Sequence, residues 1–133
     1  MTAILDTNVI VRHLTQDPPA QGRAASDFFA TADSLLLTDV IVAETVYVLQ
    51  SVYHASRTMI AESLRALLSL KSVAPEHGHI ILRTLDLYEL DRMDFADAYL
   101  VAFAETNHVP QIVSFDKGIG KASTVTRIDP GTR

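Results

Sequence analysis

Short apolar runs of strand length alternate along this chain with longer segments of helical composition, and this alternation limits the fold more than any other feature. The strand-length runs are residues 2–5, 35–37, 73–74, 111–114 and 124–128. The helical segments are a short one after residues 9–11, then residues 20–32, 40–53, 57–68, 78–90 and 94–105. Strands separated by helices predict an α/β fold, in which a mostly parallel sheet carries helices on both faces.

The composition fits one domain, residues 1–133. Of the 133 residues, 48% are hydrophobic, which is enough for one core, and we find no repeat or linker. The chain has no Cys, which excludes disulfides, a thiolate zinc site and a cysteine nucleophile. No apolar run approaches the ~20 residues of a membrane span. The N-terminus lacks the basic region of a signal peptide, so we expect a cytoplasmic protein.

The charge balance limits how the chain could hold nucleic acid. Eleven Lys and Arg against 16 Asp and Glu give a net charge of −5. A domain that binds nucleic acid by its overall field is usually basic, so this class is disfavoured. The balance still allows an enzyme that holds RNA through a few local basic side chains and a metal ion.

Four acids stand in apolar surroundings, unlike most acids of the chain. Asp6 and Asp116 each follow a predicted strand, where ligands bind in open α/β sheets. Glu44 and Asp97 lie in helices that look buried, and an unpaired carboxylate there is costly. Each acid also has an ordinary explanation: Asp6 and Asp116 suit turns or helix caps, Glu44 suits an ion pair, and Asp97 suits the first turn of a helix.

The four acids together predict a site for a hard cation. Acids at strand ends and at the starts of buried helices can converge at one edge of a sheet, where like charges repel. Mg²⁺, with Mn²⁺ as a substitute, accepts oxygen ligands and relieves that repulsion. Because no His or Cys belongs to the set, it points to hydrolysis of phosphodiester bonds.

At these residues the chain resembles the PIN-domain family, and within it the VapC-type toxins of type II toxin–antitoxin modules. The resemblance covers nearly the whole chain. Its motifs are Leu5-Asp6-Thr7-Asn8, residues 39–49 with Glu44, Asp94-Phe95-Ala96-Asp97-Ala98, and Ser114-Phe115-Asp116. The order and spacing of these motifs in a short chain make the set specific.

The resemblance implies a three-layer α/β/α fold and a metal-dependent endoribonuclease. Asp6, Glu44, Asp97 and Asp116 match the acidic quartet of the family. Thr7, Asn8 and Ser114 match polar positions that orient the acids, although the family usually has Thr at the place of Ser114. The extra acid Asp94 stays open between a helix cap and a supporting role. The toxins are homodimers inhibited by a cognate antitoxin, which is the partner we expect beside RNA.

RNA must be held despite the negative charge of the chain. Arg12 follows Asp6 by one to two helical turns, and Lys117 and Lys121 follow Asp116 closely. We therefore name these three as candidate RNA-binding residues, although each also suits a solvated surface. The five His residues show no partner at metal-ligand spacing, so we expect them on the surface or in loops.

Two other classes of function remain open. One is a non-catalytic PIN-like interaction module, which would keep the fold without binding a metal. The other is an acidic, Mg²⁺-binding phosphoacceptor signalling domain. That class should have paired acids after its first strand, but Thr7 and Asn8 follow Asp6 here.

Overall fold

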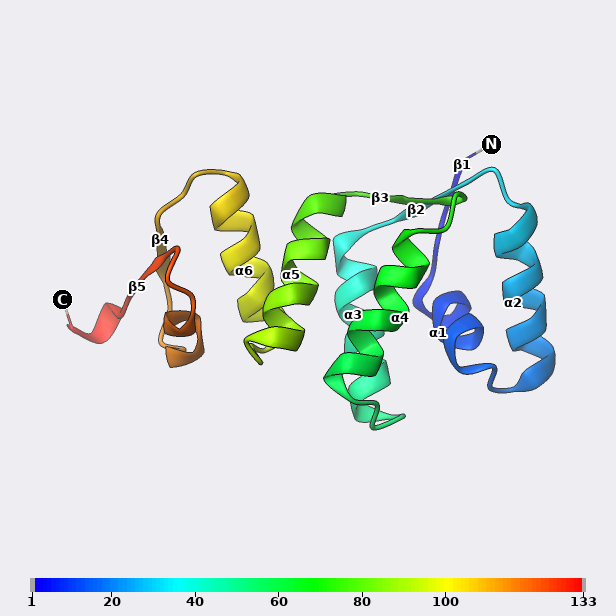
Figure 1. Ribbon diagram of the computed structural model, residues 1–133, viewed down its shortest axis with the longest axis horizontal. Helices are drawn as coiled ribbons and strands as arrows, with labels where there is room; N and C mark the ends of the chain where they lie inside the picture. The colour runs from blue at the N-terminus through cyan, green and yellow to red at the C-terminus, as the bar shows by residue number, and fades with distance from the viewer. Residues whose placement is uncertain (1, 133) are drawn as a thin grey trace. The chain divides into compact units, whose positions relative to one another are not determined.

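The computed structural model describes residues 2–132, and the two ends of the expected domain, Met1 and Arg133, lie outside the described residues. The chain divides into two compact units, Met1–Gly78 and His79–Arg133. Each unit contains parallel strands and helices (Figure 1).

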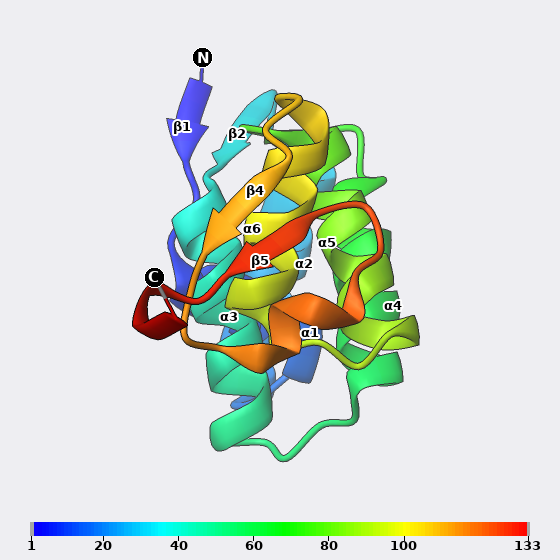
Figure 2. The same ribbon diagram turned by 90° about the vertical axis from the view of Figure 1, so that its left-hand side faces the viewer.

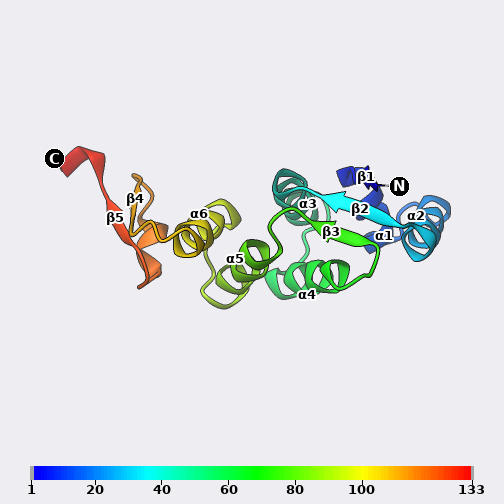
Figure 3. The same ribbon diagram turned by 90° about the horizontal axis from the view of Figure 1, so that it is seen from above.

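The first unit is a parallel three-stranded sheet with four helices. The strands pair in the order β1-β2-β3, and Leu37 at the end of β2 lies opposite Pro75 at the end of β3. In the view from above, β2 and β3 lie side by side (Figure 3). The elements are β1 (Thr2–Ile4), α1 (Thr7–Thr15), α2 (Pro19–Thr31), β2 (Ser34–Leu37), α3 (Asp39–Ser51), α4 (Arg57–Leu68) and β3 (Val73–Pro75).

Local sequence sets the boundaries of these helices. The Thr38 hydroxyl accepts the Ile41 N–H at 3.3 Å and begins α3, and the Ser56 hydroxyl accepts the Met59 N–H at 3.1 Å and begins α4. Pro19 occupies the first position of α2, where a missing N–H costs nothing. The apolar core of the unit includes Leu35, Leu37, Val42, Val46, Ile60 and Leu64.

The second unit packs a pair of parallel strands beside two helices. Figure 2 shows β4 and β5 side by side along α6. Glu105 on α6 accepts two hydrogen bonds from Arg83 on α5, at 2.9 and 3.2 Å, and one from the Thr124 hydroxyl. The elements are α5 (Gly78–Leu90), α6 (Phe95–Thr106), β4 (Gln111–Val113), η1 (Lys117–Lys121), β5 (Thr126–Ile128) and η2 (Pro130–Thr132).

The predicted α/β fold with parallel strands is confirmed. The described strands form two hydrogen-bonded sets, β1-β2-β3 and β4-β5, and every pairing is parallel. Element boundaries differ from the expected ones by a residue or two, as at β5. Among residues 2–132, no helix combines the length and the apolar character that crossing a membrane requires.

Candidate metal centre

Three carboxylates meet in the second unit, from Asp94, Asp97 and Asp116. One carboxylate oxygen of each lies within 4.8 Å of the others. Asp94 is the N-cap residue of α6 and Asp97 lies in the first turn of that helix, while Asp116 follows β4 and begins η1. Asp97 is buried, with 9% of its surface exposed, and the other two are exposed.

The backbone after β4 holds Asp116 in place. The Ser114 hydroxyl accepts the Asp116 N–H at 2.9 Å, and Asp116 Oδ1 accepts the Gly118 N–H at 2.8 Å. A Cβ on Gly118 would lie 3.0 Å from Asp116 Oδ1 and 3.2 Å from Asp97 Oδ2. Glycine therefore lets the start of η1 approach both carboxylates, and Ser114 shapes the turn that carries one of them.

The electrostatics of the cluster differ between its two central acids. Burial raises the pKa of Asp97 to about 6, and a hydrogen bond to Asp116 together with the charges of Asp116 and Asp94 adds to the rise. The pKa of Asp116 is lowered, first by that hydrogen bond and then by the Gly118 N–H. The Asp97 carboxyl group is therefore mostly protonated below about pH 6. A divalent cation bound in place of that proton would relieve the repulsion among the three carboxylates.

The other two predicted ligands, Asp6 and Glu44, belong to the first unit. Asp6 follows β1 and begins α1, as expected, and its side chain is exposed. Glu44 lies on α3 and is also exposed, so the interpretation of Glu44 as a carboxylate among buried side chains is wrong. Its helix exposes Val40 (73%) and Tyr47 (66%), because α3 carries apolar residues on its exposed face as well as its buried one.

The polar residues expected beside the acids fall into different environments. Thr7 is buried (4% exposed), and its hydroxyl oxygen has no hydrogen-bond partner within residues 2–132. Asn8 is exposed one residue further along α1. A buried hydroxyl without a partner beside Asp6 is a group that a bound ion's water shell or a neighbouring carboxylate could satisfy.

The structure therefore brings together Asp94, Asp97 and Asp116. Asp94 occupies the N-cap position of α6 without a side-chain capping hydrogen bond, and its carboxylate lies in the acidic cluster. A supporting role for Asp94 at this site remains a prediction. That Asp6 and Glu44 share one site with these residues remains a prediction.

The candidate RNA-binding residues are placed as follows. Lys117 and Lys121 are exposed at the two ends of η1. Arg12 is half-buried on α1, and its Nε donates to Gln21 Oε1 at 2.9 Å. Arg12 also lines an apolar hollow of about 520 Å³ between β1, α1 and α2, together with Asp6 and Phe28.

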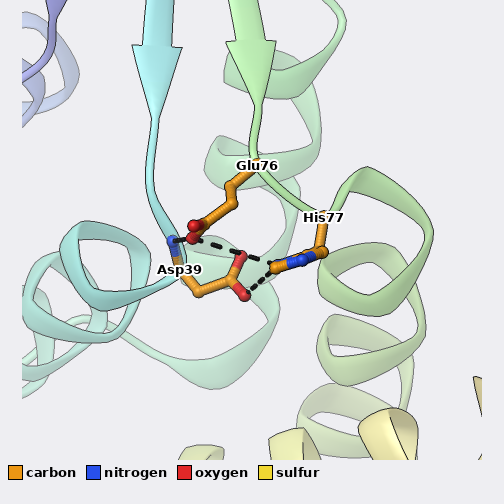
Figure 4. A group of neighbouring side chains, drawn as sticks. All are labelled: Asp39, Glu76 and His77. Atoms are coloured by element: carbon orange, nitrogen blue, oxygen red, sulfur yellow. Dashed lines mark hydrogen bonds and ion pairs between the residues drawn. The ribbon is translucent and has the colours of Figure 1, made fainter. Parts of the chain in front are cut away.

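A second cluster, Asp39, Glu76 and His77, lies in the first unit (Figure 4). Glu76 Oε1 accepts the Asp39 N–H at 3.0 Å, and His77 Nδ1 lies 2.6 Å from Asp39 Oδ2. The hydrogen bond to Asp39 raises the pKa of His77, and the charges of Asp39 and Glu76 raise it further. These contacts fasten the start of α3 to the end of β3.

Sequence reasoning missed this cluster. His77 lies in an exposed loop, as expected, but its acidic partner Asp39 is 38 residues away. The signal that could have found it is register, because β2 and β3 end opposite one another at Leu37 and Pro75. The residues that follow two paired parallel strands lie close together.

The fold and the acidic cluster together define an α/β protein in which carboxylates gather where a strand ends and a helix begins. A sequence model of the PIN domain matches residues 3–124, and the chain belongs to the PIN-domain family. Members of this family are generally metal-dependent nucleases that bind RNA. A search of the curated proteins finds no match.

The donor set of the cluster fits a divalent metal ion. Asp94, Asp97 and Asp116 offer only carboxylate oxygens, the ligands of hard cations such as Mg²⁺ and Mn²⁺. Burial is the largest cause of the raised pKa of Asp97, and the charges of Asp116 and Asp94, which such an ion would offset, add to it. The residues present could therefore hold a divalent cation.

Proposed function

We propose that this protein is a Mg²⁺-dependent endoribonuclease, with Mn²⁺ as a substitute ion, and the VapC-type toxin of a toxin–antitoxin pair. The observation that carries the proposal is the cluster of Asp94, Asp97 and Asp116 in a chain of the PIN-domain family. Three carboxylates within 4.8 Å of one another suit a hard cation, which prefers oxygen ligands.

The proposed site is the quartet Asp6, Glu44, Asp97 and Asp116. The geometry of the second unit supports Asp97 and Asp116 and adds Asp94 beside them. Family membership supports Asp6 and Glu44, whose motifs fall within the matched residues 3–124. Because this match spans both compact units, we further propose that residues 1–133 act as a single PIN-like domain.

The proposed chemistry is hydrolysis of a phosphodiester bond, in which negative charge develops on the phosphate oxygens. A divalent ion in such a site lowers the pKa of water and neutralises charge on phosphate oxygens. Asp97 and Asp116 would hold the ion, while Ser114 keeps Asp116 oriented through its hydrogen bond to the Asp116 N–H. Thr7 and Asn8 would orient Asp6, and Arg12, Lys117 and Lys121 would hold the RNA backbone. Attack by water predicts a product with a 5′-phosphate.

The proposed toxin acts on cytoplasmic RNA, forms a homodimer and is inhibited by a cognate antitoxin. The exposed apolar side chains on α6, Leu100 (46%) and Phe103 (41%), provide surface for a protein contact. Sedimentation of the purified chain, alone and with the protein encoded beside it, tests both associations.

Mapping cleavage sites on total RNA tests the proposed activity. We expect Mg²⁺-dependent cleavage that leaves 5′-phosphate ends and is lost in Asp97→Asn, because the amide cannot supply the charge that holds the ion. Asp91→Asn is the matched control, since it removes an exposed acid of the same unit outside the cluster. Ends with a 2′,3′-cyclic phosphate would contradict attack by water. A wild-type chain that binds RNA but neither binds Mn²⁺ nor cleaves the RNA would favour the interaction module.

A further inference from the structure

The ammonium group of Lys121 lies near the start of α6, the helix that carries Asp97. Lys121 is the last residue of η1, and its Nζ donates to the Arg92 carbonyl oxygen at 3.4 Å. Arg92 comes two residues before Asp94, so this contact places the ammonium beside the start of α6. The positive charge of Lys121 offsets a small part of the rise in the pKa of Asp97 and, after the charge of Arg127, adds to the lowering of the pKa of Asp116, which agrees with that placement.

The backbone that carries Lys121 is fixed on both sides. Ile119 is fully buried two residues before it, and Ala122 is buried directly after it (7% exposed). The Ala122 N–H donates to the Ile119 carbonyl at 3.2 Å and closes the turn. At the other end of η1, Gly118 is held by Asp116. The Lys121 side chain therefore starts from a rigid turn that is itself attached to one of the carboxylates.

The neighbouring cation Arg127 is engaged elsewhere. Its Nη1 donates to the Ser114 carbonyl at 2.8 Å and lies 3.7 Å from Asp129 Oδ2, and its side chain is only 20% exposed. Arg127 thus stabilises the turn between β4 and Asp116. Lys121 is exposed, and at 3.4 Å its bond to a neutral carbonyl is long for a hydrogen bond. A phosphate oxygen would be a stronger partner for this ammonium.

We propose that Lys121 contacts the phosphate group of RNA that lies at the Asp94–Asp97–Asp116 cluster, exchanging the Arg92 carbonyl for a phosphate oxygen. The inference rests on the proposed function and deepens it, because it assigns to Lys121, among the three candidate RNA-binding residues, the phosphate group that lies at the acidic cluster. Three carboxylates repel a phosphodiester, and a single ion does not offset all of their charge. A flexible ammonium at the cluster supplies the missing positive charge.

A different role for Lys121 gives different measurements. If the ammonium only neutralises the acids of the metal-free protein, Lys121→Ala strengthens Mn²⁺ binding and leaves RNA binding and cleavage unchanged. If it contacts the phosphate, RNA binding weakens even without a metal ion, and cleavage slows at saturating Mn²⁺.

The experiment compares Lys121→Ala, Lys121→Arg and the control Lys71→Ala, which removes an exposed lysine of the first unit. Binding of a fluorescent single-stranded RNA of about 20 nucleotides is followed by anisotropy against salt, in chelator. We expect Lys121→Ala to lower the slope of log affinity against log salt by about 0.7, the loss of one phosphate contact. Single-turnover cleavage at saturating Mn²⁺ should fall about 10- to 100-fold, as for a lost charge-assisted hydrogen bond.

Lys121→Arg keeps the charge, so its salt slope should match that of the wild type, and Lys71→Ala should match it in both measurements. A Lys121→Ala protein with wild-type slope and cleavage rate, while Asp97→Asn is inactive, would overturn the inference and leave the proposed function standing. Cleavage by Asp97→Asn at the wild-type rate would overturn the proposed function itself.

Discussion

At the scale of single residues, Asp97 carries the electrostatic cost of the site. It is buried, it lies beside Asp94 and Asp116, and its pKa is raised to about 6. The sequence identified this residue because apolar side chains flank it in α6. The sequence could not assign a role to Asp94, because a residue just before a helix is equally suited to capping. Only the geometry shows that the Asp94 carboxylate lies in the cluster.

Replacing Asp97 should stabilise the metal-free protein. The folded-state pKa of about 6 exceeds the ordinary value of 3.8, so the folded state binds the proton more tightly, and stability falls as the pH rises through this window. Asp97→Asn removes that loss. Above about pH 6 we expect its free energy of unfolding in chelator to exceed that of the wild type by on the order of 1 kcal/mol.

Thermal melts of the two proteins in chelator at a series of pH values measure this difference. The melting temperatures should converge only below the ordinary pKa of 3.8, at about pH 3, where the wild-type carboxyl is protonated in both states. Asp91→Asn, which changes an exposed acid outside the cluster, should not reproduce the effect. A variant that is less stable than the wild type at every pH would show that the Asp97 carboxylate supports the fold instead of straining it.

At the scale of elements, helical composition predicted most of the helices. Ser56 and Thr38 begin α4 and α3, because a short hydroxyl side chain satisfies the free N–H groups of a first turn. The apolar composition of α3 led to the wrong prediction that Glu44 lies among buried side chains, since an apolar helix need not bury every face. It also gave no sign of the contacts among Asp39, Glu76 and His77, which depend on the register of two strands far apart in sequence.

The contact between His77 and Asp39 should make the start of α3 sensitive to pH. The pKa of His77 is raised above 6.5 by its hydrogen bond to Asp39, so the charged ring favours the folded state. This contribution is fully present below about pH 6.5 and is lost as the pH rises through the raised pKa. His77→Gln should therefore lower the melting temperature at about pH 6 and have little effect at about pH 9.

Melting curves of His77→Gln against the wild type at both pH values test this contact. His79→Gln serves as the control, because it removes an exposed histidine from the same segment. A loss of stability that is equal at the two pH values would show that the ring packs without a charge. Hydrogen exchange at the N–H groups of α3 would locate the effect, since Glu76 accepts the Asp39 N–H.

At the scale of the whole molecule, the sequence predicted the family and a site of four acids, whereas the contacts within either unit involve only some of these acids. The order of four short motifs identified the family, and the match over residues 3–124 confirms it. The acids of these motifs divide between the two compact units, Asp6 and Glu44 in one and Asp97 and Asp116 in the other. Convergence of such distant residues depends on the complete fold, so local patterns of sequence could propose it without fixing its geometry.

Calorimetric titration with Mn²⁺ separates a shared quartet from a site that the second unit forms by itself. If the four acids hold one ion, Asp6→Asn, Glu44→Gln, Asp97→Asn and Asp116→Asn should each weaken Mn²⁺ binding by about 10-fold or more, because each removes a charged ligand. If Asp94, Asp97 and Asp116 suffice, Asp6→Asn and Glu44→Gln should bind Mn²⁺ as the wild type does. Glu62→Gln, an exposed acid on α4, controls for the loss of one charge. Wild-type affinity in both Asp6→Asn and Glu44→Gln would contradict the shared quartet, since a carboxylate that binds the ion cannot be neutralised without cost to its affinity.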